Sequence, residues 1–159
     1  VTQMAAIRMG AIIVIEQQVA LGEFIDTGVK LDSKVNAELL KTIFYPGTAL
    51  HDMAVIIRGD RIVAARVQLP LAEMGSLMGK QLGSRHRAAI GVTLSSDATV
   101  IIVSEETGIV SLAINGSLTR NVSEAQLRRQ LTSAVVETTP LVEQIQEKPK
   151  TTTSTKTDA

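Results

Sequence analysis

The chain contains no cysteine, no tryptophan and few aromatic residues of any kind. Without cysteine, neither a disulfide scaffold nor a thiolate metal site can form. The only histidines are His51 and His86, which excludes a zinc site with three histidine ligands. Aromatic residues make up 2% of the sequence, whereas apolar residues as a whole make up 45%. The core must therefore be built mainly from Ile, Val, Leu, Ala and Met.

The sequence also lacks a net charge and several common nucleotide-binding motifs. It has 16 basic and 16 acidic residues, so no global excess of positive charge predicts a nucleic-acid partner. No run of about 18 apolar residues is present that would cross a membrane, and we expect the chain itself to be soluble. Walker A, G-x-G-x-x-G and G-x-S-x-G patterns are absent as well.

The apolar pattern predicts one α/β domain over residues 1–138, followed by a disordered tail over residues 139–159, which is rich in Lys and Thr. Runs rich in β-branched residues predict strands over 10–16, 54–57, 62–68, 99–104 and 109–114. Residues 54–57 and 62–68 flank an Arg-Gly-Asp-Arg sequence, which predicts a hairpin turn rather than an integrin-binding tripeptide. Because neighbouring runs suggest hairpins as well as crossovers, the expected fold is a central mixed β-sheet flanked by helices.

Helical spacing predicts three longer helices between and after these strands. The first runs from residue 32 or 33 to residue 44, after a turn or short edge element at 25–29. The second covers 84–94 with Ser84 as its N-cap, and the third follows a capping box formed by Ser123 and Gln126. Helices are thus expected before, between and after the strands of the sheet.

The first cluster of polar residues is the sequence LHDMA at 50–54, directly before a predicted strand. An imidazole beside a carboxylate can hold a divalent cation, and the carboxylate of Asp52 could also draw a proton from a hydroxyl. The alternative is that Asp52 caps a turn and His51 is simply exposed.

Two further clusters lie at the start of a predicted helix and at the end of a predicted strand. The sequence GSRHRAA at 83–89 places two arginines and a histidine where backbone N–H groups favour anions, which suits phosphate. Ordinary ion pairs at a solvated helix start are the alternative. The sequence SEETG at 104–108 could supply a further metal ligand, or it could be a charged turn.

Taken together, in this order and spacing, the three clusters resemble the catalytic domain of the diadenylate cyclases, particularly the membrane-anchored type of many bacteria. That family carries Asp-Gly-Ala within L-H-D-G-A-V-I-I, Arg-His-Arg within G-[ST]-R-H-R-A-A, and S-E-E-T-G. The matching segments here are residues 50–57, 83–89 and 104–108, and the similarity extends from about residue 10 to about residue 131.

The resemblance implies an enzyme that condenses two ATP molecules into cyclic di-AMP and two pyrophosphates. Two subunits would meet face to face as a homodimer, each ribose 3′-hydroxyl attacking the α-phosphate of the other ATP with the help of Mg²⁺ or Mn²⁺. No nucleic acid would take part. The full-length protein would sit at the cytoplasmic face of the cell membrane, through segments absent from this chain.

The resemblance also implies a role for individual residues of the three clusters. The catalytic residues would be Asp52, Arg85, His86 and Arg87. The metal ligands would be His51, Asp52 and Glu106. The nucleotide would be contacted by Met53, Ala54, Leu69, Gly83, Ser84, Ser104 and Glu105.

This chain departs from the family pattern at Met53, where the family has glycine. Glycine in such a loop provides a positive φ or room for a ligand, and a non-glycine residue with positive φ costs on the order of 1 kcal/mol. Arg66 stands where a small residue is expected beside the nucleotide, and Gln68 where some relatives place an aromatic residue. We therefore expect activity to be reduced or lost while the fold is retained, and the alternative function is a catalytically degraded, nucleotide-binding regulatory domain.

Overall fold

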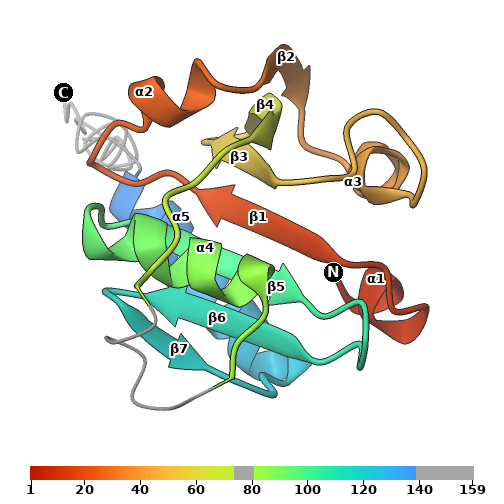
Figure 1. Cartoon of the computed structure of the whole chain (residues 1–159). Coiled ribbons are helices and arrows are strands. Elements are labelled where there is room, and N and C mark those ends of the chain that lie inside the picture. The colour runs from red at the N-terminus through yellow and green to blue at the C-terminus, as the bar shows by residue number, and fades with distance from the viewer. Residues whose placement is uncertain (74–80, 139–159) are drawn as a thin grey trace, which may run out of the picture.

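A computed structural model describes residues 1–73 and 81–138, with side chains up to residue 134 of the last helix. Its strands form one mixed sheet in the order β2-β4-β3-β1-β5-β6-β7 (Figure 1). The central strand β1 (Ala11–Ile15) pairs in parallel with β3 (Ala54–Arg58) and antiparallel with β5 (Thr99–Val103). The predicted mixed sheet flanked by helices is therefore confirmed. The tail predicted for 139–159 lies outside the described residues.

The sheet separates two apolar layers, which explains the continuous apolar runs of its central strands. On one face, Ile12 of β1 packs in a cluster with Ala89 of α4 (Ser84–Leu94). On the other face, Ile13 shares a cluster with Met4 of α1 (Thr2–Ala6) and with residues of α3 (Ala37–Phe44) and α5 (Glu124–Thr138). Because β1 is covered on both sides, each of its residues lies in or beside the core.

Two hairpins extend the sheet on either side of the central strands. β3 and β4 (Arg61–Val67) pair antiparallel around a turn in which Gly59 has a φ of 58°, as the sequence predicts. β5 pairs with β6 (Val110–Ile114), and a two-residue turn with positive φ at both positions leads on to the short strand β7 (Ser117–Thr119).

β4 contains a bulge close to its end. Ala54 pairs with Val67, but Ile56 pairs with Ala64, so one more residue lies on β4 than on β3 between these two pairs. Arg66 adopts a φ of 53° there. Bulges of this kind change the direction in which a side chain points. The residues after the bulge therefore follow a different alternation from those before it.

The predicted start of the first long helix is wrong. Residues 29–34 form an edge strand, β2 (Val29–Lys34), which pairs antiparallel with β4, and a short helix α2 (Gly22–Ile25) precedes it. α3 begins only after Asn36, whose side-chain oxygen accepts a hydrogen bond of 2.7 Å from the N–H of Leu39. β2 is mostly exposed, so it lacks the apolar run that predicts a buried strand.

The predicted N-cap of α4 is wrong, whereas the predicted capping box at the start of α5 is confirmed. Ser84 is the first helical residue of α4 rather than its N-cap, which is Gly83. The capping box of α5 is confirmed: the N–H of Ser123 donates to Gln126 Oε1 at 2.9 Å, and the N–H of Gln126 donates to Ser123 Oγ at 3.2 Å. Within the described residues, no helix has the length and apolar character needed to span a bilayer.

An ion pair between a buried glutamate and a half-exposed arginine joins the far ends of β1 and β3. Glu16 accepts hydrogen bonds from Arg58 Nε at 2.5 Å, from Arg58 Nη2 at 3.1 Å and from the N–H of Leu21 at 3.0 Å. Burial raises the pKa of Glu16, but the hydrogen bonds and positive charge of Arg58 and the bond from Leu21 outweigh it, so the pKa lies below its usual value. This carboxylate is therefore fully satisfied at neutral pH.

Candidate active site

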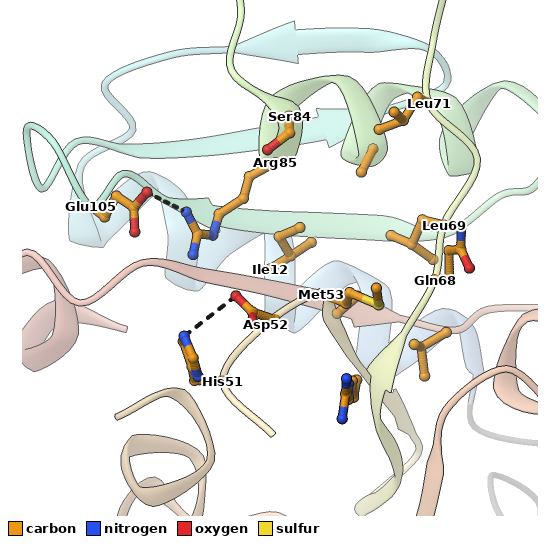
Figure 2. Close-up of a pocket in the computed structure, with 14 residues that line it drawn as sticks. Ile12, His51, Asp52, Met53, Gln68, Leu69, Leu71, Ser84, Arg85 and Glu105 are labelled. Atoms are coloured by element: carbon orange, nitrogen blue, oxygen red, sulfur yellow. Dashed lines mark ion pairs between the residues drawn. The ribbon is translucent and has the colours of Figure 1, made fainter. Parts of the chain in front are cut away.

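A cleft of about 530 Å³ opens where the loop before β3, the end of β4 and the first turns of α4 meet (Figure 2). This volume is typical of a small-molecule site. Its floor is aliphatic and belongs to the core layer beneath α4: Ile12, Ala54, Val67, Leu69 and Ala88. The cleft is therefore an opening in the apolar core, with polar residues only at its rim.

The two ends of the cleft differ in chemistry. Figure 2 shows His51, Asp52, Arg85 and Glu105 toward one end, and Gln68, Leu69 and Leu71 toward the other, with Met53 near the middle of the rim. One end is charged and the other is largely apolar. An elongated ligand with an anionic group and an apolar body would fit this arrangement.

His51 and Asp52 present their acceptor atoms to each other. His51 Nδ1 lies 2.6 Å from the carbonyl oxygen of Thr48, so we assign the ring proton to Nδ1, which donates to that carbonyl. His51 Nε2 then faces Asp52 Oδ1 at 3.4 Å. A histidine held by a backbone carbonyl, with its other nitrogen beside a carboxylate, is typical of a metal ligand. These two side chains fit a shared divalent cation.

The third predicted metal ligand does not join them. Among the described residues, no group of three or more His, Asp or Glu side chains is placed to hold one ion. Glu106 lines a neighbouring hollow instead, and its backbone oxygen accepts a bond of 3.3 Å from Arg8 Nη1. Mg²⁺ in proteins commonly takes only one or two side-chain ligands, together with water and substrate phosphates. Asp52 supplies one carboxylate of this kind, with His51 beside it.

Met53 has a positive φ, a backbone conformation that glycine adopts more easily than any other residue. Its φ is 66°, in the left-handed region, and its side chain is 45% exposed at the cleft. The chain turns sharply here, because Asp52 lies at the rim while Ala54 already pairs with Val67 inside the sheet. The left-handed conformation costs a residue with a side chain roughly 1–2 kcal/mol.

The start of α4 brings Ser84 and Arg85 to the cleft. Arg85 Nη1 lies 3.0 Å from Glu105 Oε1, and the arginine side chain is only 21% exposed. Gly10 makes room for this pair, because a Cβ at Gly10 would lie 2.9 Å from Arg85 Cζ and 3.0 Å from Glu105 Cβ. The first turn of α4 contains no acidic residue and no side-chain cap, so its N–H groups can bind an anion.

A second hollow of about 380 Å³ adjoins the cleft and shares Ser84, Arg85 and Glu105 with it. His86 lines this hollow and is 8% exposed; within the described chain its Nε2 has no hydrogen-bond partner. Burial lowers the pKa of His86, and the positive charges of Arg120 and Arg85 lower it further. The lowered pKa favours the neutral imidazole, and its unpartnered Nε2 is buried.

Ser104 also lines the second hollow, and its hydroxyl organises the turn that follows β5. Ser104 Oγ accepts bonds of 3.3 Å from the N–H groups of both Glu106 and Thr107. This serine therefore holds the turn that presents Glu105 to Arg85. Glu105 and Gly83, both predicted to contact the nucleotide, line the same hollow.

Arg87 lies outside both cavities. Its Nε donates to the carbonyl oxygen of Ala72 at 3.1 Å, and its own carbonyl accepts from the N–H of Ala72 at 3.0 Å. Gly91 lets the same segment approach the helix closely, since a Cβ there would lie 1.9 Å from the carbonyl oxygen of Pro70. Arg87 thus fixes the segment that contains Leu69 and forms one wall of the cleft.

Two residues of this region were not predicted from the sequence. Arg120 lines the second hollow beside Ser84 and His86, yet as a single basic residue after a turn it carries no motif. In the sequence, Gly10 stands at the beginning of an apolar run that predicts a strand. A glycine at such a position does indicate a close approach of other groups to the backbone, and this signal was available.

Comparison with known proteins places the chain in one family. Residues 1–118 match the family described as DisA bacterial checkpoint controller nucleotide-binding. The cyclic di-AMP synthase CdaA of Bacillus subtilis (strain 168) is 47% identical over 131 residues, which are 82% of this chain and 48% of that protein. A diadenylate cyclase of Listeria monocytogenes serotype 1/2a (strain 10403S) is 43% identical over 136 residues, covering 86% of this chain and 50% of that protein.

Solved structures agree with these relatives. A double mutant of DacA from Staphylococcus aureus superposes with a TM-score of 0.81 at 42% identity, covering 84% of this chain and 89% of that one. A hypothetical membrane spanning protein from Bacillus cereus gives a TM-score of 0.72 at 44% identity, with coverages of 76% and 59%. The resemblance seen in the three sequence clusters is therefore confirmed. The chain spans about half the length of the curated relatives it matches.

Proposed function

Since this chain belongs to the DisA bacterial checkpoint controller nucleotide-binding family, we propose that it is a diadenylate cyclase, which condenses two ATP molecules into cyclic di-AMP. One observation carries the proposal. Three clusters that lie far apart in the sequence meet around one cleft with a charged end and an apolar end. The relatives named cyclic di-AMP synthase and diadenylate cyclase support the same reaction.

The proposed reaction forms one bond and breaks one bond at each α-phosphorus. The ribose 3′-oxygen of one ATP bonds to the α-phosphorus of the other, the bond from that phosphorus to the bridging oxygen breaks, and pyrophosphate leaves with the bond electrons. The carboxylate of Asp52 accepts the proton of the 3′-hydroxyl. Arg85 and the N–H groups at the start of α4 bind phosphate oxygens.

Mg²⁺ or Mn²⁺ would be held by His51 Nε2 and Asp52 Oδ1. Such an ion, when bound, offsets the negative charge that gathers on the phosphate oxygens. His86, which lines the second hollow, would place a neutral ring beside the phosphates. Arg120 adds a positive charge on the same side, where the leaving pyrophosphate needs one.

A homodimer is part of this proposal. Each cleft accommodates one nucleotide, so two clefts must face each other before two bonds can form between two ATP molecules. The side chain of Asp52 is 68% exposed and Met53 is 45% exposed, so the reacting side of the cleft is open to a partner. We also propose that the whole protein is held at the cytoplasmic face of the membrane by segments outside this chain, as a structural relative described as membrane spanning suggests.

Met53 supports a second candidate function. A strained residue beside Asp52 could displace that carboxylate from its working position, and a shift of about 1 Å can reduce a rate on the order of a hundredfold. The chain would then bind nucleotide without turning it over, as a regulatory domain.

Incubation with ATP and either Mn²⁺ or Mg²⁺ tests the two candidates. Products are separated by chromatography and identified by mass, with Asp52→Asn as the control. Cyclic di-AMP from the wild-type chain above the level of this control supports the cyclase. Nucleotide binding without product supports the regulatory domain, and the absence of both contradicts the site itself.

A further inference from the structure

An arginine that has no partner among the described residues lines the cleft. Arg66 lies in the bulge of β4, is exposed, and lines the cleft together with Met53 and Gln68. Within the described residues its guanidinium forms no hydrogen bond and no ion pair, in contrast to Arg85 at the charged end, which is paired with Glu105. The reaction proposed above uses the charged end and leaves Arg66 without a role.

The bulge keeps this charge out of the apolar core. Ala65 is buried in the core layer beneath α3, and Val67 is buried in the layer beneath α4. In a regular strand, Arg66 would point into the layer opposite Ala65, where a charge has no partner. The positive φ of Arg66 releases it from this alternation, so that both neighbours stay buried while the arginine emerges at the rim.

The bulge is also held rigidly from outside. A Cβ at Gly28 would lie 2.5 Å from the carbonyl oxygen of Ala65 and 2.7 Å from Val67 Cγ2, so the segment before β2 packs directly against the bulge. Thr27 Oγ1 accepts a hydrogen bond of 2.9 Å from the N–H of Gln68, one residue after the bulged strand ends. The backbone that carries Arg66 is therefore organised before any ligand binds.

The apolar end of the cleft has no aromatic ring. The three aromatic residues of the chain lie elsewhere: Phe24 and Phe44 pack against the two core layers, and Tyr45 lines a shallow groove beside α1. A purine bound here finds aliphatic side chains and one planar group with delocalised charge, the guanidinium of Arg66. Guanidinium groups stack well on aromatic faces.

We propose that Arg66 is a positioning residue of the nucleotide site, and that its guanidinium stacks on the purine base. This inference rests on the proposed function, because it requires a nucleotide in the cleft. A nucleotide whose phosphates bind at Arg85 and the start of α4 would place its base toward Leu69, which lines the cleft together with Arg66. The arginine thus takes the place of an aromatic stacking residue, and the bulge holds it there.

The test separates contact with the base from contact with the phosphates. Affinities for adenosine, for a non-hydrolysable ATP analogue and for inorganic triphosphate are measured by calorimetry on wild type, Arg66→Asn and Arg66→Lys. Asparagine tolerates the positive φ, so the fold is retained. Arg120→Gln, at the phosphate end, is the contrasting variant.

Stacking predicts that Arg66→Asn weakens adenosine and the ATP analogue by a similar factor, about twofold to thirtyfold, and leaves inorganic triphosphate unchanged. Arg66→Lys keeps the charge but loses the plane, so it should behave like Arg66→Asn. Arg120→Gln should weaken the triphosphate and the ATP analogue only.

Three results would overturn the stacking role: weaker binding of inorganic triphosphate by Arg66→Asn, unchanged binding of the ATP analogue, or full retention of affinity by Arg66→Lys. A wild-type chain that binds none of the three ligands would instead contradict the proposed function, and thermal melting of each variant would show whether it is folded.

Discussion

The substitution Met53→Gly should increase both stability and turnover. Met53 has a φ of 66°, a conformation that costs a residue with a side chain about 1–2 kcal/mol and costs glycine nothing. Glycine gives the unfolded chain more conformational freedom, which offsets about 0.4–1 kcal/mol of this gain. The free energy of unfolding should therefore rise by up to about 1.5 kcal/mol, measured by urea denaturation.

Turnover should change more than stability. Met53 lies between Asp52 and the first residue of β3 and lines the cleft, so relief of its strain shifts the carboxylate relative to the substrate. If the shift approaches 1 Å, the rate should rise roughly tenfold to a hundredfold. The assay is the initial rate of cyclic di-AMP formation at saturating ATP, and we expect the change in kcat rather than in KM.

Met53→Ala is the matched control for this substitution. Alanine removes the thioether but keeps a Cβ, and with it the cost of the positive φ. A gain with glycine but not with alanine shows that the backbone limits the reaction, whereas equal gains show that the side chain does. If glycine raises neither stability nor turnover, the argument from the conformation of Met53 is wrong.

Three further predictions concern the ion pair between Glu16 and Arg58, the close approach at Gly10 and the metal. Glu16→Gln should lower the free energy of unfolding by about 2 kcal/mol at pH 7, with half-exposed Arg58 keeping the loss below that of a fully buried pair. Because the pKa of Glu16 is lowered in the folded protein, its contribution to stability is complete above the usual glutamate pKa and is lost as the pH falls through the folded pKa. The free energy of unfolding, measured by urea titration, should therefore fall less at acid pH in Glu16→Gln than in the wild type. An equal fall in both proteins would contradict this. Gly10→Ala should reduce turnover about tenfold or more by displacing the adjacent guanidinium–carboxylate pair, whereas Gly22→Ala, whose Cβ would meet nothing within 4 Å, should not. His51→Gln should raise the Mn²⁺ concentration needed for half-maximal activity about tenfold or more, and an unchanged metal requirement would remove His51 from the site.

Much of the fold follows from local pattern. β1 and β5 are buried on both faces, so they appear in the sequence as continuous apolar runs. The capping box before α5 involves only residues three apart. β2 could not be recognised in this way, because it is exposed and exists only through its pairing with β4. Its polar residues were therefore assigned to the following helix.

The sequence by itself determined the family, the mixed sheet and the three clusters that bear the chemistry, because each is a short pattern of neighbouring residues. Only the tertiary structure decided what each member of a cluster contacts. Arg85 and Arg87 are two residues apart, but a helix turns by about 200° over that interval. Arg85 consequently faces the cleft, whereas Arg87 binds Ala72.

Side-chain direction likewise separates Glu105 from Glu106, and the packing of distant segments brings Arg120 beside His86. Glu105 pairs with Arg85, while Glu106 lines only the second hollow, away from His51 and Asp52. These contacts depend on side-chain direction and on pairing between distant strands, and a linear pattern of residue types carries neither.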